Sequence, residues 1–188
     1  MAAIKEVIEP EDVFVGNIKA PITITFYVDY ESQACASANE VIKSVYESNK
    51  EKVRLNIRHF PLTNKHQKAM KAAEAVVAAS QEGKVWEMHN LLFENRKNLG
   101  LISLKKYAKE LDLVNKKILD QLVNGTYGWQ VRGDLLDALK KGIRNVPAIL
   151  VNEHLFEEKI TVENLIRFMN DVIRTSHENT QHDIENLK

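Results

Sequence analysis

The segment Ile22–Val28 alternates apolar and polar side chains, and this period of two is typical of a β-strand. A helical spacing of apolar residues follows from Ser32 to about Ser48, and alternation returns in residues 53–60 until Pro61 ends it. A strand, a helix and a second strand in this order form a βαβ unit. Such a unit predicts two parallel strands joined by a right-handed crossover, which places the chain in the α/β class.

Residues 64–142 carry helical spacings of apolar side chains. We expect helices over residues 66–81, 85–95 and 127–141, one helix capped by Ser103, and a short helix that ends near Gly125. This block is therefore predicted to be an all-helical insertion.

Strand patterns return after Gly142. Residues 146–151 are predicted to form a buried strand, 152–154 a turn, and 155–156 the start of a short return strand. Thr161 is expected to cap a last helix, and the polar residues 175–188 are expected to form a flexible tail. The predicted organisation is a first part over residues 14–63 (β-α-β), a helical domain over 64–142, a second part over 143–174 (β-β-α), and the tail.

Between the first strand and its helix lies Ser32-Gln33-Ala34-Cys35, an S-x-x-C spacing. Two cysteines at this spacing, where a strand leads into a helix, are typical of a thiol–disulfide redox motif. Here the first position is serine, and Cys35 is the only cysteine in the chain. Because two thiols are needed to close an internal disulfide, we expect that this chain cannot cycle a dithiol.

Ser32 has two compatible interpretations. Serine is a favoured N-cap, so we expect its side-chain oxygen to accept an amide of the first helical turn. No base lies beside it in the sequence, which makes a nucleophilic role the weaker hypothesis, although a capping hydroxyl can still donate to a ligand. Cys35 is interpreted as a small core residue, with a reactive monothiol as the alternative. The acidic neighbours Asp29 and Glu31 oppose thiolate formation.

The chain contains 26 Lys and Arg and 26 Asp and Glu, so its net charge is zero. We therefore expect neither nucleic acid nor a membrane as a partner. The six histidines are not spaced as metal ligands, so no metal site is predicted. The N-terminus lacks the basic start and apolar stretch of a signal peptide, and a single free cysteine suits a reducing compartment. A cytoplasmic location is expected.

With these elements in this order, the chain resembles the DsbA-like branch of the thioredoxin superfamily. The resemblance is strongest to single-domain bacterial forms and to the thioredoxin-like domains fused to some sodium/proton antiporters, and it extends over residues 14–173. It is carried by residues 20–23, 28–31, 60–62, 66–75, 83–93 and 142–148. The resemblance implies an α/β thioredoxin fold, made of a βαβ half and a ββα half, with an inserted all-helical domain.

The resemblance also implies a site. The family motif is usually Glu-Cys-Pro-x-Cys, and here it is Glu31-Ser32-Gln33-Ala34-Cys35, so the attacking cysteine and the proline after it are both replaced. Ser32 and Cys35 occupy the two redox positions. A cis peptide bond between Val146 and Pro147 is implied beside the motif. Residues expected to contact a substrate or partner are Gln33, Ala34, Val146 and Pro147.

Three functions remain open from the sequence. The first is a DsbA-like oxidoreductase homologue that has no cofactor, has lost dithiol activity and binds an extended polypeptide by β-augmentation near Pro147. The second is a glutathione-binding transferase or isomerase similar to the kappa-type enzymes, in which the Ser32 hydroxyl would hydrogen-bond the glutathione thiolate. The third is a monothiol redox site at Cys35.

Overall fold

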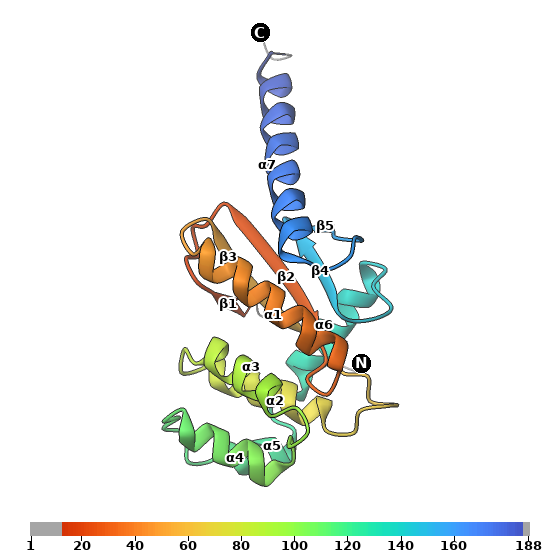
Figure 1. The fold of residues 1–188 in the computed structure, drawn as a ribbon. Coiled ribbons are helices and arrows are strands. Elements are labelled where there is room, and N and C mark those ends of the chain that lie inside the picture. Colours follow the sequence, from red (N-terminus) through yellow and green to blue (C-terminus); the bar gives the residue numbers. More distant parts are fainter. Residues whose placement is uncertain (1–12, 186–188) are drawn as a thin grey trace, which may run out of the picture.

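The computed structural model of the protein describes residues 13–185, with side chains for residues 13–175. Its centre is a five-stranded sheet in the order β1-β3-β2-β4-β5 (Figure 1). The strands are β1 (Phe14–Val15), β2 (Ile22–Val28), β3 (Val53–His59), β4 (Ala148–Val151) and β5 (His154–Leu155). The sheet thus combines strands from both ends of the sequence.

The predicted parallel pair is confirmed. β2 and β3 run in parallel with Ile22 opposite Val53 and Val28 opposite His59, and α1 (Gln33–Ser48) connects them. Both strands are buried over nearly their whole length, as expected for central strands covered on two faces. β1 was not predicted, because two residues are too short to show a period of two.

The antiparallel part of the sheet is also confirmed, with shifted boundaries. β4 pairs with β2, with Ala148 opposite Tyr27, and β5 pairs with β4. β4 begins at Ala148 rather than at Val146. Proline has no N–H to donate to a ladder, so Pro147 lies outside the paired segment.

The predicted helical insertion separates β3 from β4. Its helices are α2 (Ala69–Ser80), α3 (Val85–Glu94), α4 (Leu101–Glu110), α5 (Ile118–Asn124) and α6 (Gly128–Lys140). α2 lies at its centre and contacts α3, α4, α5 and α6. Such contacts are possible because its buried positions are mostly alanine, which lets neighbouring helices approach closely.

Two expectations for helices need correction. Ser103 does not cap α4, because the helix already begins at Leu101 after the extended residue Gly100. Leu101 is partly buried against the core, so its packing extends the helix toward the N-terminus. The last helix, α7 (Val162–Glu185), continues through residues 175–185, which were expected to be a flexible tail. No glycine or proline follows Thr161 to stop it, and Figure 1 shows α7 projecting beyond the sheet. Residues 186–188 lie outside the described residues.

The two faces of the sheet are covered by different helices. α1 crosses one face and contacts α7, while α6 lies against β3 on the other face (Figure 1). Tyr27 of β2 donates a hydrogen bond to Asp137 of α6. In consequence the helical insertion is held to the sheet through its last helix, and the start of α1 lies at the end of β2 where the two domains meet.

Candidate functional site

Ser32 is the N-cap of α1, as the sequence predicted. Its backbone is extended, with φ −73° and ψ 123°, and its Oγ accepts a hydrogen bond from the backbone N–H of Cys35 at 3.3 Å. Its own N–H donates to the carbonyl of Asp29 at 3.1 Å, which forms a tight turn from β2 into α1. The Ser32 Oγ therefore accepts from the Cys35 N–H, and its hydroxyl group also hydrogen-bonds the Cys35 thiol, which lowers the pKa of that thiol.

Cys35 lies in the hydrophobic core with none of its surface exposed. Its Sγ accepts a hydrogen bond from the backbone N–H of Asp29 at 3.5 Å. Burial raises the pKa of the Cys35 thiol to about 11, against the smaller opposing effect of the hydrogen bonds from Asp29 and Ser32. At pH 7 a thiol of this pKa is a thiolate in only about one molecule in ten thousand, so the preferred interpretation of Cys35 as a core residue agrees with the structure.

Asp29 organises the loops around the motif, a role that the sequence analysis missed. Its buried carboxylate accepts from the backbone N–H of Glu31 at 2.8 Å and from that of Leu62 at 2.7 Å. His66 Nδ1 lies 2.9 Å from the same carboxylate oxygen that binds Leu62. Asp29 thus connects the turn before α1 to the loop after β3. Nothing in the sequence signals this contact, because its partners are backbone groups.

Gln33 and Ala34 are exposed on the first turn of α1, where a partner can reach them. The Gln33 side-chain oxygen accepts a hydrogen bond from the Arg96 guanidinium, and its amide nitrogen donates to Ser37 Oγ at 3.4 Å. Arg96 follows α3 and belongs to the helical insertion. The insertion therefore places a cation beside the motif, which the sequence analysis did not predict.

Val146 and Pro147 lie at the same end of the sheet as the motif. Their peptide bond is cis. Tyr27 pairs with Ala148, so continuing this antiparallel register brings Pro147 and Val146 alongside the residues that lead from β2 into the motif. Val146 is buried, yet within residues 13–185 neither its backbone N–H nor its carbonyl forms a hydrogen bond. Each backbone N–H and carbonyl needs a hydrogen-bond partner, so both groups of Val146 are available to another molecule.

A chain of buried hydrogen bonds lies beneath the motif and links the two domains. The Tyr30 hydroxyl bonds His89 Nδ1 at 2.9 Å, and His89 Nε2 bonds Asn39 Oδ1 at 2.8 Å. Because the amide oxygen of Asn39 can only accept, His89 carries its proton on Nε2 and accepts from Tyr30. Burial lowers the pKa of His89 to about 3, so this histidine is neutral.

A second buried contact attaches the end of β3 to α6. His59 Nδ1 lies 2.7 Å from Asp134 Oδ2, and the same oxygen accepts from the backbone N–H of His59 at 3.1 Å. Arg58 donates to the other oxygen of Asp134 at 2.7 Å. This contact holds the helical insertion against the sheet. Among the described residues no group of three His, Cys, Asp or Glu side chains is arranged to hold a metal.

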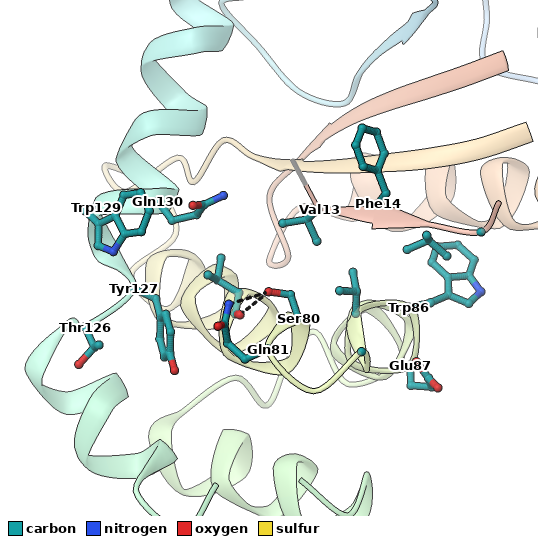
Figure 2. Close-up of a pocket in the computed structure, with 15 residues that line it drawn as sticks. Val13, Phe14, Ser80, Gln81, Trp86, Glu87, Thr126, Tyr127, Trp129 and Gln130 are labelled. Carbon is teal, nitrogen blue, oxygen red and sulfur yellow. Dashed lines mark hydrogen bonds between the residues drawn. The ribbon is translucent and has the colours of Figure 1, made fainter. Parts of the chain in front are cut away.

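A large cavity lies apart from this site. It measures about 780 Å³ and lies between β1, α2, α3 and the start of α6. Figure 2 shows Tyr127, Trp129 and Gln130 on one side of it and Trp86 on the other. Neither the residues of the S-x-x-C motif nor Val146 and Pro147 line this cavity, so we assign the candidate site by the motif and the sheet register.

The sequence profile of the thioredoxin family matches residues 9–171. The chain belongs to this family. As a thioredoxin-family protein it is 31% identical over 153 residues to the Na⁺/H⁺ antiporter NhaA 3 of Salinispora tropica, a match that covers 80% of this chain and 23% of the antiporter. It is 30% identical over 150 residues to the antiporter NhaA 1 of Salinispora arenicola, with coverage of 80% and 23%. The chain thus spans about a quarter of the length of these curated relatives.

Solved structures of other proteins share the fold of this thioredoxin-family chain. Oxidised BdbD from Bacillus subtilis superposes with a TM-score of 0.78 at 19% identity, covering 87% of this chain and 95% of BdbD. The α-DsbA1 protein of Wolbachia pipientis superposes with a TM-score of 0.75 at 18% identity, covering 92% and 96%. At this identity the likeness establishes the fold: a thioredoxin fold with a helical insertion, as in DsbA. Along the described part of the chain, no helix is both long and apolar enough to span a bilayer.

Proposed function

We propose that this chain is a DsbA-like domain that binds extended polypeptide without exchanging disulfides. The observation that carries the proposal is the contrast inside the site. The only cysteine is fully buried with a raised thiol pKa, whereas Val146 at the same end of the sheet has an unpaired backbone N–H and carbonyl. An extended peptide can satisfy both backbone groups by adding as a strand, and the exposed Gln33 and Ala34 would contact its side chains.

Polypeptide binding is tested with a reduced, carboxymethylated and fluorescently labelled ribonuclease A, followed by fluorescence anisotropy. The variant Val146→Pro removes the backbone N–H and is expected to lose most of the binding. Val146→Ala keeps the N–H and is the matched control, which should bind as the unmodified chain does. Equal binding by all three proteins would reject the proposed role of Val146, and thermal unfolding of each variant verifies that it is folded.

Loss of redox activity is tested separately with insulin reduction by dithiothreitol. The chain is expected to give the same rate as buffer, because it has one buried thiol and no second thiol to resolve a mixed disulfide. A rate well above buffer would contradict the proposal. The structure also disfavours a monothiol site, since such a site needs an accessible thiolate and the Cys35 sulfur is covered.

Glutathione binding is the second candidate function. It is favoured by the position of Ser32 at the N-terminus of α1 and by Arg96, whose guanidinium lies beside Gln33 and offers a cation to a carboxylate. Calorimetry with reduced glutathione decides between the two functions. Binding that weakens in Ser32→Ala would place the glutathione thiol at Ser32, while no binding by the unmodified chain at millimolar glutathione would remove this candidate.

A cytoplasmic location is also proposed, on the sequence argument alone. Cell fractionation of the native protein is the test, and recovery with a periplasmic or secreted marker would contradict it.

A further inference from the structure

The positive charge of the chain is unevenly distributed. Residues 97–117, which contain α4, hold six lysines and two acidic residues, Glu110 and Asp112, a net charge of +4 in a chain whose total is zero. All six lysines are exposed, and they are Lys97, Lys105, Lys106, Lys109, Lys116 and Lys117. We call this the α4 surface. Figure 1 shows α4 and α5 at the end of the molecule farthest from the projecting end of α7.

The side chains of the six lysines on the α4 surface have no partner among residues 13–175. Within the described residues none of the six forms an ion pair or a side-chain hydrogen bond, whereas Lys50, Lys71, Lys84 and Lys141 elsewhere each pair with a glutamate. Six lysines in one short stretch outnumber Glu110 and Asp112, and the excess positive charges repel one another. The arrangement therefore favours contact with an anionic surface, which relieves the repulsion.

The same surface presents the two most exposed large apolar side chains of the described part of the chain. Ile102 is 86% exposed and Val114 is 79% exposed. Ile102 lies one helical turn before Lys105 and Lys106 and two turns before Lys109, so all four share one face of α4. An aliphatic side chain pointing into water and surrounded by lysines matches the chemistry of a bilayer interface, with an apolar interior beneath anionic headgroups.

The loop that carries Val114 is held in place. The Glu82 carboxylate accepts from the backbone N–H groups of Val114 and Asn115 at 2.7 and 3.1 Å. Val114 also lines a hollow of about 550 Å³, beside Lys105, Lys109 and Lys116. Asp112 is the acidic residue among its lining groups, and the floor is apolar, with Ala108, Leu113 and Ile118. Hydrogen bonds to Glu82 therefore hold the loop in the conformation that exposes Val114. The hollow beside it can receive an apolar group next to the lysines.

From these observations we propose that the α4 surface docks on the surface of an anionic phospholipid bilayer, with Ile102 and Val114 entering the headgroup region and the lysines contacting phosphates. The net charge of zero led us to expect no membrane partner. A net charge sums over the whole chain, so it hides a basic surface that acidic regions elsewhere balance. A lysine close to an anionic bilayer strengthens binding about fivefold, so the lysines together outweigh the two acidic neighbours.

The test is co-sedimentation of the full chain with vesicles of phosphatidylcholine, with and without about one third phosphatidylglycerol. We expect binding only to the anionic vesicles and weaker binding as salt rises. The double variant Lys105→Gln and Lys109→Gln should weaken binding about thirtyfold, and Ile102→Ser should weaken it measurably as well. Both changes affect exposed side chains, so the variants are expected to fold.

The matched control lies on α6, where Leu136 and Lys140 are also exposed and four residues apart. The variant Leu136→Ser with Lys140→Gln removes one exposed aliphatic side chain and one lysine away from the α4 surface, and it should bind vesicles as the unmodified chain does. Equal binding to neutral vesicles, or equal losses in the α4 and α6 variants, would overturn the proposal. Binding to polyglutamate without binding to anionic vesicles would also overturn it, and would assign the surface to an acidic protein.

Discussion

The two sides of the candidate site use their polar groups in opposite ways. On the motif side, the N–H of Cys35 bonds Ser32, the N–H of Asp29 bonds Cys35, and the Asp29 carboxylate bonds backbone groups of two loops. On the Val146 side, the backbone N–H and carbonyl of Val146 have no partner within the described residues. The motif side is closed by its own hydrogen bonds, while the Val146 side still offers bonds to another molecule. Loss of a cysteine therefore need not remove a binding surface.

The largest expected effect comes from restoring the missing thiol. Ser32→Cys places two thiols at the spacing of a redox motif at the start of a helix, so mild oxidation is expected to form an internal disulfide. Thiol titration should fall from two groups to none per chain, and insulin reduction should rise above buffer. Ser32→Ala is the control and should keep one thiol. Two titratable thiols after oxidation would show that the closed side has lost its redox geometry as well as its cysteine.

Removal of the Asp29 carboxylate should destabilise the loops around the motif. Asp29→Ala leaves two backbone N–H groups without their acceptor, and unfolding by urea is expected to show a loss of about 2–4 kcal/mol. Asp29→Asn keeps one acceptor oxygen and should lose less. If both variants were as stable as the unmodified chain, the hydrogen bonds of Asp29 would not be what closes this side.

The buried network beneath the motif predicts a pH dependence of stability. The pKa of His89 is about 3 in the folded chain and near 6.5 when unfolded. Between these two pH values His89 binds a proton in the unfolded chain but not in the folded chain. The stability that neutral His89 contributes above pH 6.5 is therefore lost as the pH falls. The loss is about 2 kcal/mol between pH 6.5 and pH 5. Urea unfolding at several pH values measures it, and His89→Gln should flatten the slope. An equal slope in both proteins would assign the effect to other groups.

The smallest effect is expected from the cap of α1. Ser32→Ala removes the acceptor for the Cys35 N–H and should lower stability by about 1 kcal/mol. Thr161→Ala removes the equivalent bond at α7, where Thr161 Oγ1 accepts from Asn164 N–H at 3.2 Å, and should cost a similar amount without any effect on ligand binding. A Ser32→Ala variant with unchanged stability would mean that Ser32 is not held by its capping bond.

Local patterns predicted much of this fold. The βαβ unit, the helical insertion and the final β-β-α order follow from periods of two and 3.6 residues, which report burial along each element. The strand at residues 14–15 was not predicted, because two residues are too short to show a period. The start of α4 at Leu101 was not predicted either, because the packing of Leu101 against the core extends the helix past the capping signal at Ser103. The residues of the motif were found because a cysteine and a serine at a fixed spacing can be recognised locally.

The sequence by itself determined that this chain has one thiol, a capped helix after a central strand, and therefore no internal disulfide. Only the tertiary structure decided that Cys35 is buried, that Asp29 and Arg96 join the motif, and that Val146 has unpaired backbone groups. The physical reason is distance along the chain. Asp29 meets Leu62 across 33 positions and Gln33 meets Arg96 across 63, and contacts of that range form only when the sheet and the helical insertion pack together.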